Sequence, residues 1–191
     1  MNEIVIAAAA SAVKANLESA RLGSRFGRLD LSSKLALLSV EKLAVDFSKF
    51  PPSRIGICLA AKMGSLSTDF DYWAGRGQAG GPSPTLFAYT LPSAAIGEIA
   101  IRHRLTGPNL CFIGDHQPVL REAAELIRQG AADAMICVSC SALSESAASL
   151  LGNSPAAKAC AIWLLRGSSG LRVLGENDRD MDSLCDILAG Q

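Results

Sequence analysis

A short turn between two apolar segments lies where many enzymes hold a nucleophile. The sequence around it predicts a strand, a sharp turn, a helix and a second strand, and the turn consists of Asp115, His116, Gln117 and Pro118. A helix N-terminus presents free N–H groups and the positive end of its dipole to a developing anion, which would activate a serine or cysteine placed there. The turn contains neither residue type. We therefore predict an elbow without a nucleophile.

The cysteines are the other residues that could do chemistry. Most of the six lie inside apolar runs, which favours buried free thiols in a reducing compartment. "CVSC" has C-x-x-C spacing, but it ends a strand-like run instead of starting a helix, and no second ligand pair is spaced for a metal. We expect no redox site, no metal and no cofactor. The six are Cys58, Cys111, Cys137, Cys140, Cys160 and Cys185.

The composition bounds the class of protein. The chain has 191 residues, of which 49% are hydrophobic and 19% charged, and its formal net charge is zero. That length suffices for one domain with a core, and the lack of a basic excess argues against a nucleic-acid binder. No run reaches the ~18 apolar residues of a membrane span, and the N-terminal apolar run carries Glu3 and no basic leader. We expect one domain over 1–191, a cytoplasmic location, no nucleic acid and no membrane span.

Apolar runs alternate with helix-like segments along the chain. Ser32 or Ser33 is the expected N-cap of the first long helix, and Pro118 and Gly130 suit the first turn and the C-cap of the third. Apolar strands separated by helices predict an α/β fold with a mostly parallel sheet covered on both faces. We expect strands over 2–13, 54–61, 109–115, 132–143 and 156–169, helices over 32–47, 93–105 and 117–130, a long loop over 63–92, a short connection over 144–155, and a strand remnant with a helix over 171–190.

Four blocks of sequence together resemble a known family. "SRFGRLDLSSKLALLSVEKL", "RIGICLAAKMGSLSTDFDYW", "TLFAYTLPSAAIGEIAIRHRLTGPN" and "LREAAELIRQGAADAMICVSC" are similar, in order, to the N-terminal half of β-ketoacyl-acyl-carrier-protein synthases. The similarity extends from about residue 1 to residue 166, and "YTLPSAAIGEIAIRHRLTGPN" is its most specific block. The resemblance implies a single thiolase-like core of layered α-β-α architecture with a mostly parallel mixed sheet, one half of the usual duplicated fold.

Two departures from that family concern catalysis. In catalytic relatives a nucleophilic cysteine follows the proline of Gly-Pro by eight residues, and that spacing from Pro108 falls on His116. Cys111 comes five residues too early and lies within the strand. The relatives also take a pair of catalytic histidines from their second half, whereas this chain has only His103 and His116, and His103 is expected at a helix surface or end. The resemblance therefore implies a vestigial elbow at Asp115, His116 and Gln117.

His116 does not replace the missing cysteine. The helix dipole would keep an imidazole at this position neutral at pH 7, able to donate or accept one hydrogen bond. Decarboxylative condensation also needs a thiolate to hold the acyl chain and donors to hold the enolate. A single histidine supplies neither, so we predict no confident catalytic residue.

The resemblance favours a non-catalytic accessory subunit. Chain-length-factor-like partners of ketosynthases also lack the cysteine, often with glutamine in its place, and Gln117 lies one residue beyond that position. Such a subunit would shape or support a partner's pocket in fatty acid, polyketide or aryl-polyene type acyl-chain synthesis. In this fold, dimers pair the strand before the elbow across a two-fold axis, so we expect a dimer with a ketosynthase or with itself. The dimer strand is Asn109, Leu110, Cys111, Phe112 and Ile113.

Two alternatives remain open on the sequence. One is a stand-alone acyltransferase or thioesterase that acylates another thiol, for which Cys140 is the candidate because it ends a strand. The other is a module that binds an acyl chain or an acyl carrier protein. Five arginines could meet an acidic carrier protein, although ordinary surface charge is the favoured explanation of them: Arg21, Arg25, Arg28, Arg102 and Arg104.

Overall fold

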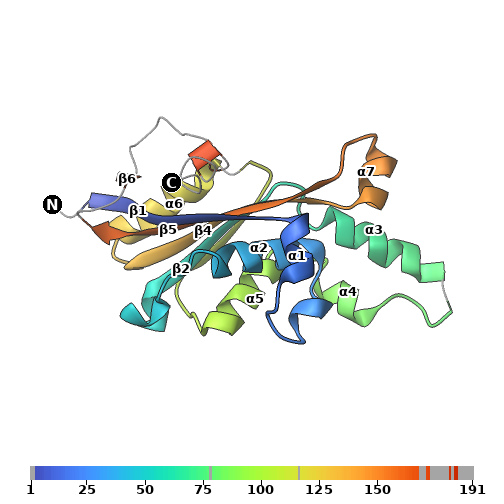
Figure 1. The fold of residues 1–191 in the computed structure, drawn as a ribbon, viewed down its shortest axis with the longest axis horizontal. Coiled ribbons are helices and arrows are strands. Elements are labelled where there is room, and N and C mark those ends of the chain that lie inside the picture. The colour runs from blue at the N-terminus through green and yellow to red at the C-terminus, as the bar shows by residue number, and fades with distance from the viewer. Residues whose placement is uncertain are drawn as a thin grey trace.

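A six-stranded mixed sheet forms the centre of the molecule, with strand order β3-β2-β4-β5-β1-β6 (Figure 1). The computed structural model describes residues 3–77, 79–115, 117–167, 171–172, 181, 183 and 184. β2 runs parallel to both β3 and β4, while β5 is antiparallel to its neighbours β4 and β1. The expected α/β fold with a mixed sheet is confirmed, and the sheet has two parallel and three antiparallel strand pairings. The strands are β1 (Glu3–Val13), β2 (Ile55–Ala61), β3 (Asn109–Ile113), β4 (Ala134–Leu143), β5 (Ala156–Gly167) and β6 (Leu171–Arg172).

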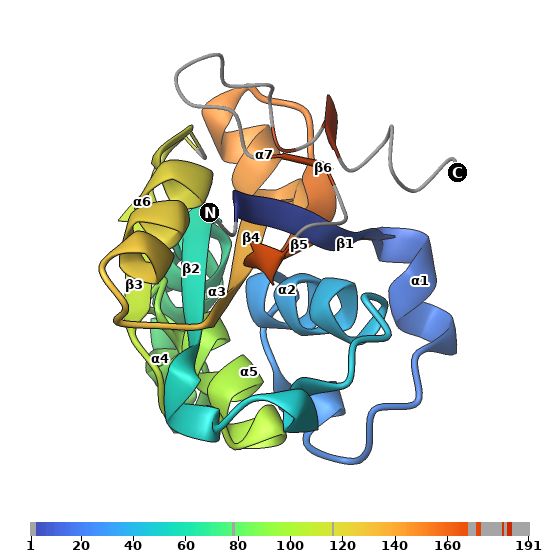
Figure 2. The ribbon, with the colours of Figure 1, turned by 90° about the vertical axis from the view of Figure 1, so that its left-hand side faces the viewer.

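Helices cover both faces of this sheet. α2 and α5 pack on one face and α6 on the other, which gives the expected α-β-α layers (Figure 2). Within the described ranges, no helix is long and apolar enough to cross a membrane. The helices are α1 (Lys14–Ser19), α2 (Leu31–Glu41), α3 (Leu66–Ala74), α4 (Pro84–Ala88), α5 (Ala94–His103), α6 (Gln117–Arg128) and α7 (Glu145–Leu151).

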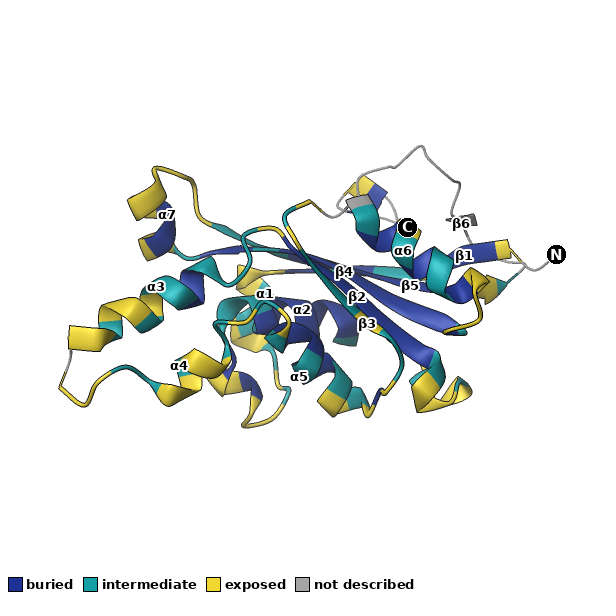
Figure 3. Cartoon of the chain, turned by 180° about the vertical axis from the view of Figure 1, so that it is seen from behind, coloured by how far each residue is buried: buried dark blue, intermediate teal, exposed yellow. Residues whose placement is uncertain are grey.

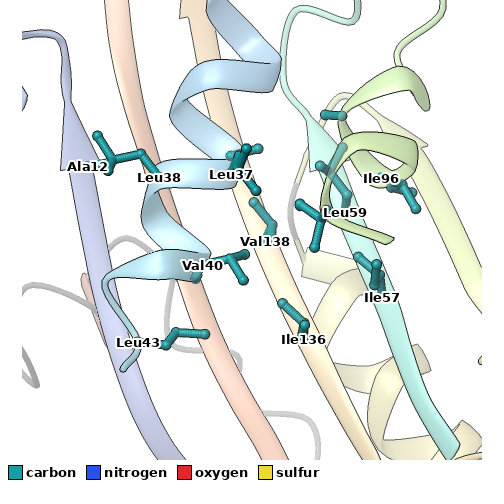
Figure 4. Packing of buried hydrophobic residues seen from close by; sticks show 14 of the residues in the cluster. Ala12, Leu37, Leu38, Val40, Leu43, Ile57, Leu59, Ile96, Ile136 and Val138 are labelled. Carbon is teal, nitrogen blue, oxygen red and sulfur yellow. The ribbon is translucent and has the colours of Figure 1, made fainter. Parts of the chain in front are cut away.

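The two faces of the sheet belong to two separate apolar clusters. Successive side chains of a strand point to opposite faces, so Ile57 and Leu59 of β2 join the cluster under α2 and α5, whereas Cys58 joins the cluster under α6. Figure 4 shows Leu37 and Val40 of α2 over β4 in the first cluster. Because both faces are covered, β2 is buried at every position and carries no polar side chain, as the sequence predicts.

The N-terminal boundary of α2 differs from the expected one. Its N-cap is Asp30, whose carboxylate accepts a hydrogen bond from the Ser33 N–H at 3.0 Å, so the prediction of Ser32 or Ser33 as the cap is wrong. The helix also ends earlier than expected, at Glu41, because Ala44 adopts a left-handed conformation with φ 53°. The long predicted helix therefore divides into α2 and a turn.

The segment 63–92, which we call the arm, is not the long loop that its Gly, Ser and Pro content predicts. It contains α3 and α4, and Ser83 caps α4 with Pro84 in the first turn. α3 is stabilised by residues outside the arm, because Leu66 and Phe70 pack against Leu143 of β4 and the neighbouring α7. The expected connection 144–155 contains α7, and most of the expected C-terminal elements lie outside the described residues.

The Gly-Pro turn before β3 is packed directly on the start of β2. A Cβ atom on Gly107 would lie 2.2 Å from the Ile55 carbonyl oxygen, and one on Gly56 would lie 2.6 Å from the Pro108 carbonyl oxygen. The close approach allows the Ile57 N–H to donate to that Pro108 oxygen at 2.9 Å. Glycine at both positions thus allows the close packing that sets the register of β3 against β2.

Candidate functional site

The predicted elbow is a strand, a tight turn and a helix. Gly114 follows β3 with φ 103°, a conformation that glycine adopts freely, and its N–H donates to the Ala61 carbonyl at 3.1 Å. Asp115 is exposed, and α6 begins two residues later. His116 and the side chain of Gln117 lie outside the described residues. The chemistry of the elbow therefore stays a prediction from the sequence.

β3 lies at the end of the sheet and hydrogen bonds to β2 alone among the described strands. Its residues are only partly buried, and Ile113 is 72% exposed (Figure 3). Since the Gly114 N–H points to β2 and directions alternate along a strand, the N–H groups of Cys111 and Ile113 point away from the sheet. An apolar edge with outward N–H groups is a template for pairing with another chain.

Exposed apolar side chains gather around the carboxyl ends of the parallel strands. Ile113 ends β3, and the position of a Cβ on Gly64 lies 3.7 Å from both Ile113 Cγ2 and Pro92 Cγ, so the edge adjoins the base of the arm. α3, α4 and α7 extend beyond this end of the sheet (Figure 3). The other exposed apolar residues of these segments are Trp73, Phe87, Leu91, Leu150 and Leu151.

Polar contacts attach the arm to the rest of the domain. The Thr68 hydroxyl donates to Asp30 at 3.0 Å, which links α3 to the cap of α2. The Ser65 hydroxyl donates to the Thr90 carbonyl at 2.6 Å, which closes the base of the arm. The Ser67 hydroxyl accepts from the backbone of Ser144 at 2.9 Å. These bonds hold the N-terminal end of α3 against the carboxyl end of the sheet.

A buried carboxylate connects α5 to the loop that carries Arg25 and to the arm. Glu98 of α5 accepts from Arg25 Nε at 2.8 Å and Nη2 at 2.9 Å, and from the Tyr89 hydroxyl at 3.0 Å. Its pKa is lowered mainly by the hydrogen bonds from Arg25, against the opposite effect of burial. From the sequence Arg25 is expected to be a surface charge, and its ion pair with Glu98 is not predicted.

This carboxylate predicts a loss of stability in acid. The pKa of Glu98 is lowered from 4.5 in the folded protein. As the pH falls below 4.5, Glu98 is therefore protonated in the unfolded chain while it stays ionised in the folded protein. The stabilisation is complete above that pH and is lost as the pH falls through the lower folded-state pKa. Urea unfolding at pH 6, 4 and 3 should show a smaller acid loss in Glu98→Gln than in the wild type. Equal losses would contradict this assignment.

The thiols do not form an acylation site. Burial raises the pKa of Cys58 to about 12 and that of Cys137 well above its usual range. Cys140, the candidate acyl acceptor, is 1% exposed and its sulfur lies 3.4 Å from the Ser32 hydroxyl. Cys111 is half-buried, and burial raises its pKa as well. Cys160 is disulfide-bonded, so the expectation of free thiols is wrong for it.

The C-x-x-C spacing has no redox or metal geometry. Cys137 and Cys140 are three residues apart on β4, and an odd separation places strand side chains on opposite faces of a sheet. Accordingly, Cys137 lies in the cluster under α6, while Cys140 packs with Leu35 on the other side. The described residues contain no cluster of His, Cys, Asp and Glu that would hold a metal ion.

Thiol labelling of the native protein should therefore be slow. We expect Cys58, Cys137 and Cys140 to react only after unfolding, and Cys111 to react first because it is the least buried of the four free thiols. Timed alkylation followed by peptide mapping measures this order. Rapid labelling of Cys140 in the folded protein would instead support the stand-alone acyltransferase.

His103 is the last residue of α5, as expected from the sequence. Its ring packs edge-on against Phe47, with centroids 4.8 Å apart, and burial lowers its pKa. Nε2 lies 3.3 Å from a carboxylate oxygen of Glu41 without hydrogen-bond geometry. Arg102 pairs with the same carboxylate. This cluster joins α2 to α5.

Comparison with known proteins identifies the fold. No protein-family model and no curated protein matches the sequence. Among solved structures, a chain of the ishigamide ketosynthase/chain length factor aligns with 89% of this chain at 18% identity and a TM-score of 0.68. The chain has the fold of ketosynthases and chain length factors. A likeness at this identity shows the fold alone, and it confirms the resemblance to that extent.

Two further structures share this ketosynthase-like fold. The type II polyketide synthase complex AntDE:AntF, a ketosynthase with its acyl carrier protein, gives a TM-score of 0.73 at 17% identity over 87% of this chain. The ketosynthase ApeO with its chain length factor ApeC from Xenorhabdus doucetiae gives 0.62 at 16% identity over 87%. The chain covers 64%, 63% and 80% of the three solved chains, so it spans less than two thirds of the first two.

Proposed function

We propose that this protein is a non-catalytic, chain-length-factor-like subunit that pairs with a ketosynthase through β3. The observation that carries the proposal is an apolar strand at the sheet edge, with Ile113 exposed, leading directly into an elbow whose sequence has no cysteine or serine. The edge suits a partner, and the elbow sequence suits a subunit that leaves acyl transfer to that partner.

The thiols support the non-catalytic part of the proposal. Thioester chemistry needs a thiolate that substrate can reach, and the free thiols of the described residues are buried or half-buried with raised pKa values at Cys58, Cys111 and Cys137. Asp115 is the exposed residue of the elbow that the structure describes, and a carboxylate is a poor acceptor of an acyl group from a thioester. The partner would therefore hold the growing chain.

The nature of the partner follows from the fold and its exposed end. Ishigamide ketosynthase/chain length factor and ApeO with ApeC are pairs of this kind, and AntDE binds an acyl carrier protein. In this protein the arm, α7 and β3 place their exposed apolar residues at one end of the sheet. We infer that a ketosynthase covers this end, and that the pair extends acyl chains of the polyketide type from a carrier protein.

Co-expression with ketosynthases from the same genome tests the proposal. We expect one of them to co-purify with this protein as a 1:1 heterodimer that stays associated on dilution during sedimentation analysis. A homodimer through β3 would contradict the choice of partner. A monomer that ignores every ketosynthase would contradict the proposal as a whole.

A further inference from the structure

The outer part of the arm contributes little to the core of the domain, against which Tyr89 packs as a partly buried side chain. None of the described residues from Asp71 to Ala94 is buried, although the segment carries the large apolar side chains of Trp73, Phe87 and Leu91. A segment without buried apolar side chains has little to offset the entropy of ordering its backbone, and its local stability is low. Specific polar contacts must then decide how it is held.

Tyr89 provides such a contact immediately after α4. Its hydroxyl donates to Glu98, which is 8% exposed and also accepts both hydrogen bonds from Arg25. Tyr89 is two residues from both Phe87 and Leu91, so this bond fixes the backbone between the two exposed apolar side chains. The ring of Phe87 lies 5.5 Å from that of Tyr72, which extends the restraint to α3.

The bond has the geometry of a strong interaction. A charged acceptor strengthens a hydrogen bond about twofold, and the two-pronged contact with Arg25 holds the carboxylate in one orientation. Glu98 itself lies on α5, between Ala95 and Ile99 of the buried face, so it is anchored to the core. The arm is thereby tied to the rigid part of the domain through a side chain that has little freedom to move.

We propose that Glu98, acting through Tyr89, is a positioning residue that holds the arm ready for its partner. The inference rests on the proposed function, because the partner is the ketosynthase that covers the apolar end of the sheet. Ordering the arm in advance reduces the entropy lost when Phe87 and Leu91 are buried in the complex. Glu98 contacts no partner or substrate in this role.

Two substitutions at the contact and two controls test this role. Tyr89→Phe removes only the hydroxyl that reaches Glu98, and Glu98→Gln removes the charge while keeping the shape. Tyr72→Phe removes the other tyrosine hydroxyl of the same arm. Asp133→Asn breaks a comparable two-pronged ion pair with Arg54, with contacts of 2.7 and 3.1 Å, at the opposite end of the strands. Each variant is measured by hydrogen exchange, thermal melting and ketosynthase binding.

We expect Tyr89→Phe and Glu98→Gln to speed amide exchange over 83–92 about tenfold in the free protein and to weaken ketosynthase binding about tenfold. Tyr72→Phe should change neither, and Asp133→Asn should lower the melting temperature without either effect. Unchanged exchange in both contact variants, or an equal change in Asp133→Asn, would overturn the inference. If the wild type binds no ketosynthase, the proposed function fails, while the exchange measurement still decides whether Glu98 orders the arm.

Discussion

Replacing Ile113 by lysine is expected to weaken binding of the ketosynthase about 100-fold, equivalent to about 2.7 kcal/mol. Ile113 is 72% exposed in the free protein, at the end of the edge strand and beside the base of the arm. In the proposed complex its side chain would be buried, and a lysine there would bury an unpaired charge. Isothermal titration of the purified subunits measures the change.

Ile101 provides the matched control for this experiment. It is 61% exposed on α5, and Ile101→Lys is the same chemical change away from the edge strand. We expect Ile101→Lys to bind the ketosynthase like the wild type, and both variants to keep the wild-type melting temperature because both side chains are already in solvent. Equal weakening by both variants, or none by Ile113→Lys, would show that β3 is not the contact.

Replacing Gly107 by alanine is expected to lower the free energy of unfolding by about 3 kcal/mol. The new Cβ would lie 2.2 Å from the Ile55 carbonyl oxygen, and this neighbour is backbone that belongs to the start of β2. Relief of the clash must therefore move the Gly-Pro turn away from the sheet. That movement would break the hydrogen bond from Ile57 N–H to the Pro108 oxygen. Urea denaturation followed by circular dichroism gives the value.

Gly97→Ala is the control for Gly107→Ala. A Cβ on Gly97 has no neighbour within 4 Å, and the residue lies inside α5, where alanine is the better helix former. We expect this variant to be more stable than the wild type by about 0.5 to 1 kcal/mol. A Gly107→Ala protein as stable as the wild type would mean that the turn is not packed on β2 as described.

Most of the sheet and its covering helices could be predicted from the sequence. Central strands covered on both faces are largely apolar, and β2 shows this over its whole length and β4 over its first five residues. The elbow is also marked in the sequence. Glycine favours the positive φ after β3, and proline favours the first turn of a helix such as α6. Strong local constraints of this kind leave little choice of structure.

The arm could not be predicted, because its structure depends on distant residues. The sequence of α3 is rich in Ser, Thr and Asp, which are poor helix formers. Its helix is stabilised by the packing of Leu66 and Phe70 against Leu143 and α7. Glu98 was missed for the same reason, although one signal was present. It lies three residues after Ala95 and one before Ile99, where the helical period predicts a buried side chain, and a buried carboxylate requires partners.

The proposed function requires that this protein pairs with a ketosynthase and carries no acyl group itself. Native mass spectrometry tests both parts at once, on the co-purified complex after incubation with acyl-loaded carrier protein. We expect a 1:1 heterodimer in which, after dissociation in the instrument, the acyl mass stays on the ketosynthase. An acyl mass on this protein, or the absence of a heterodimer, would contradict it.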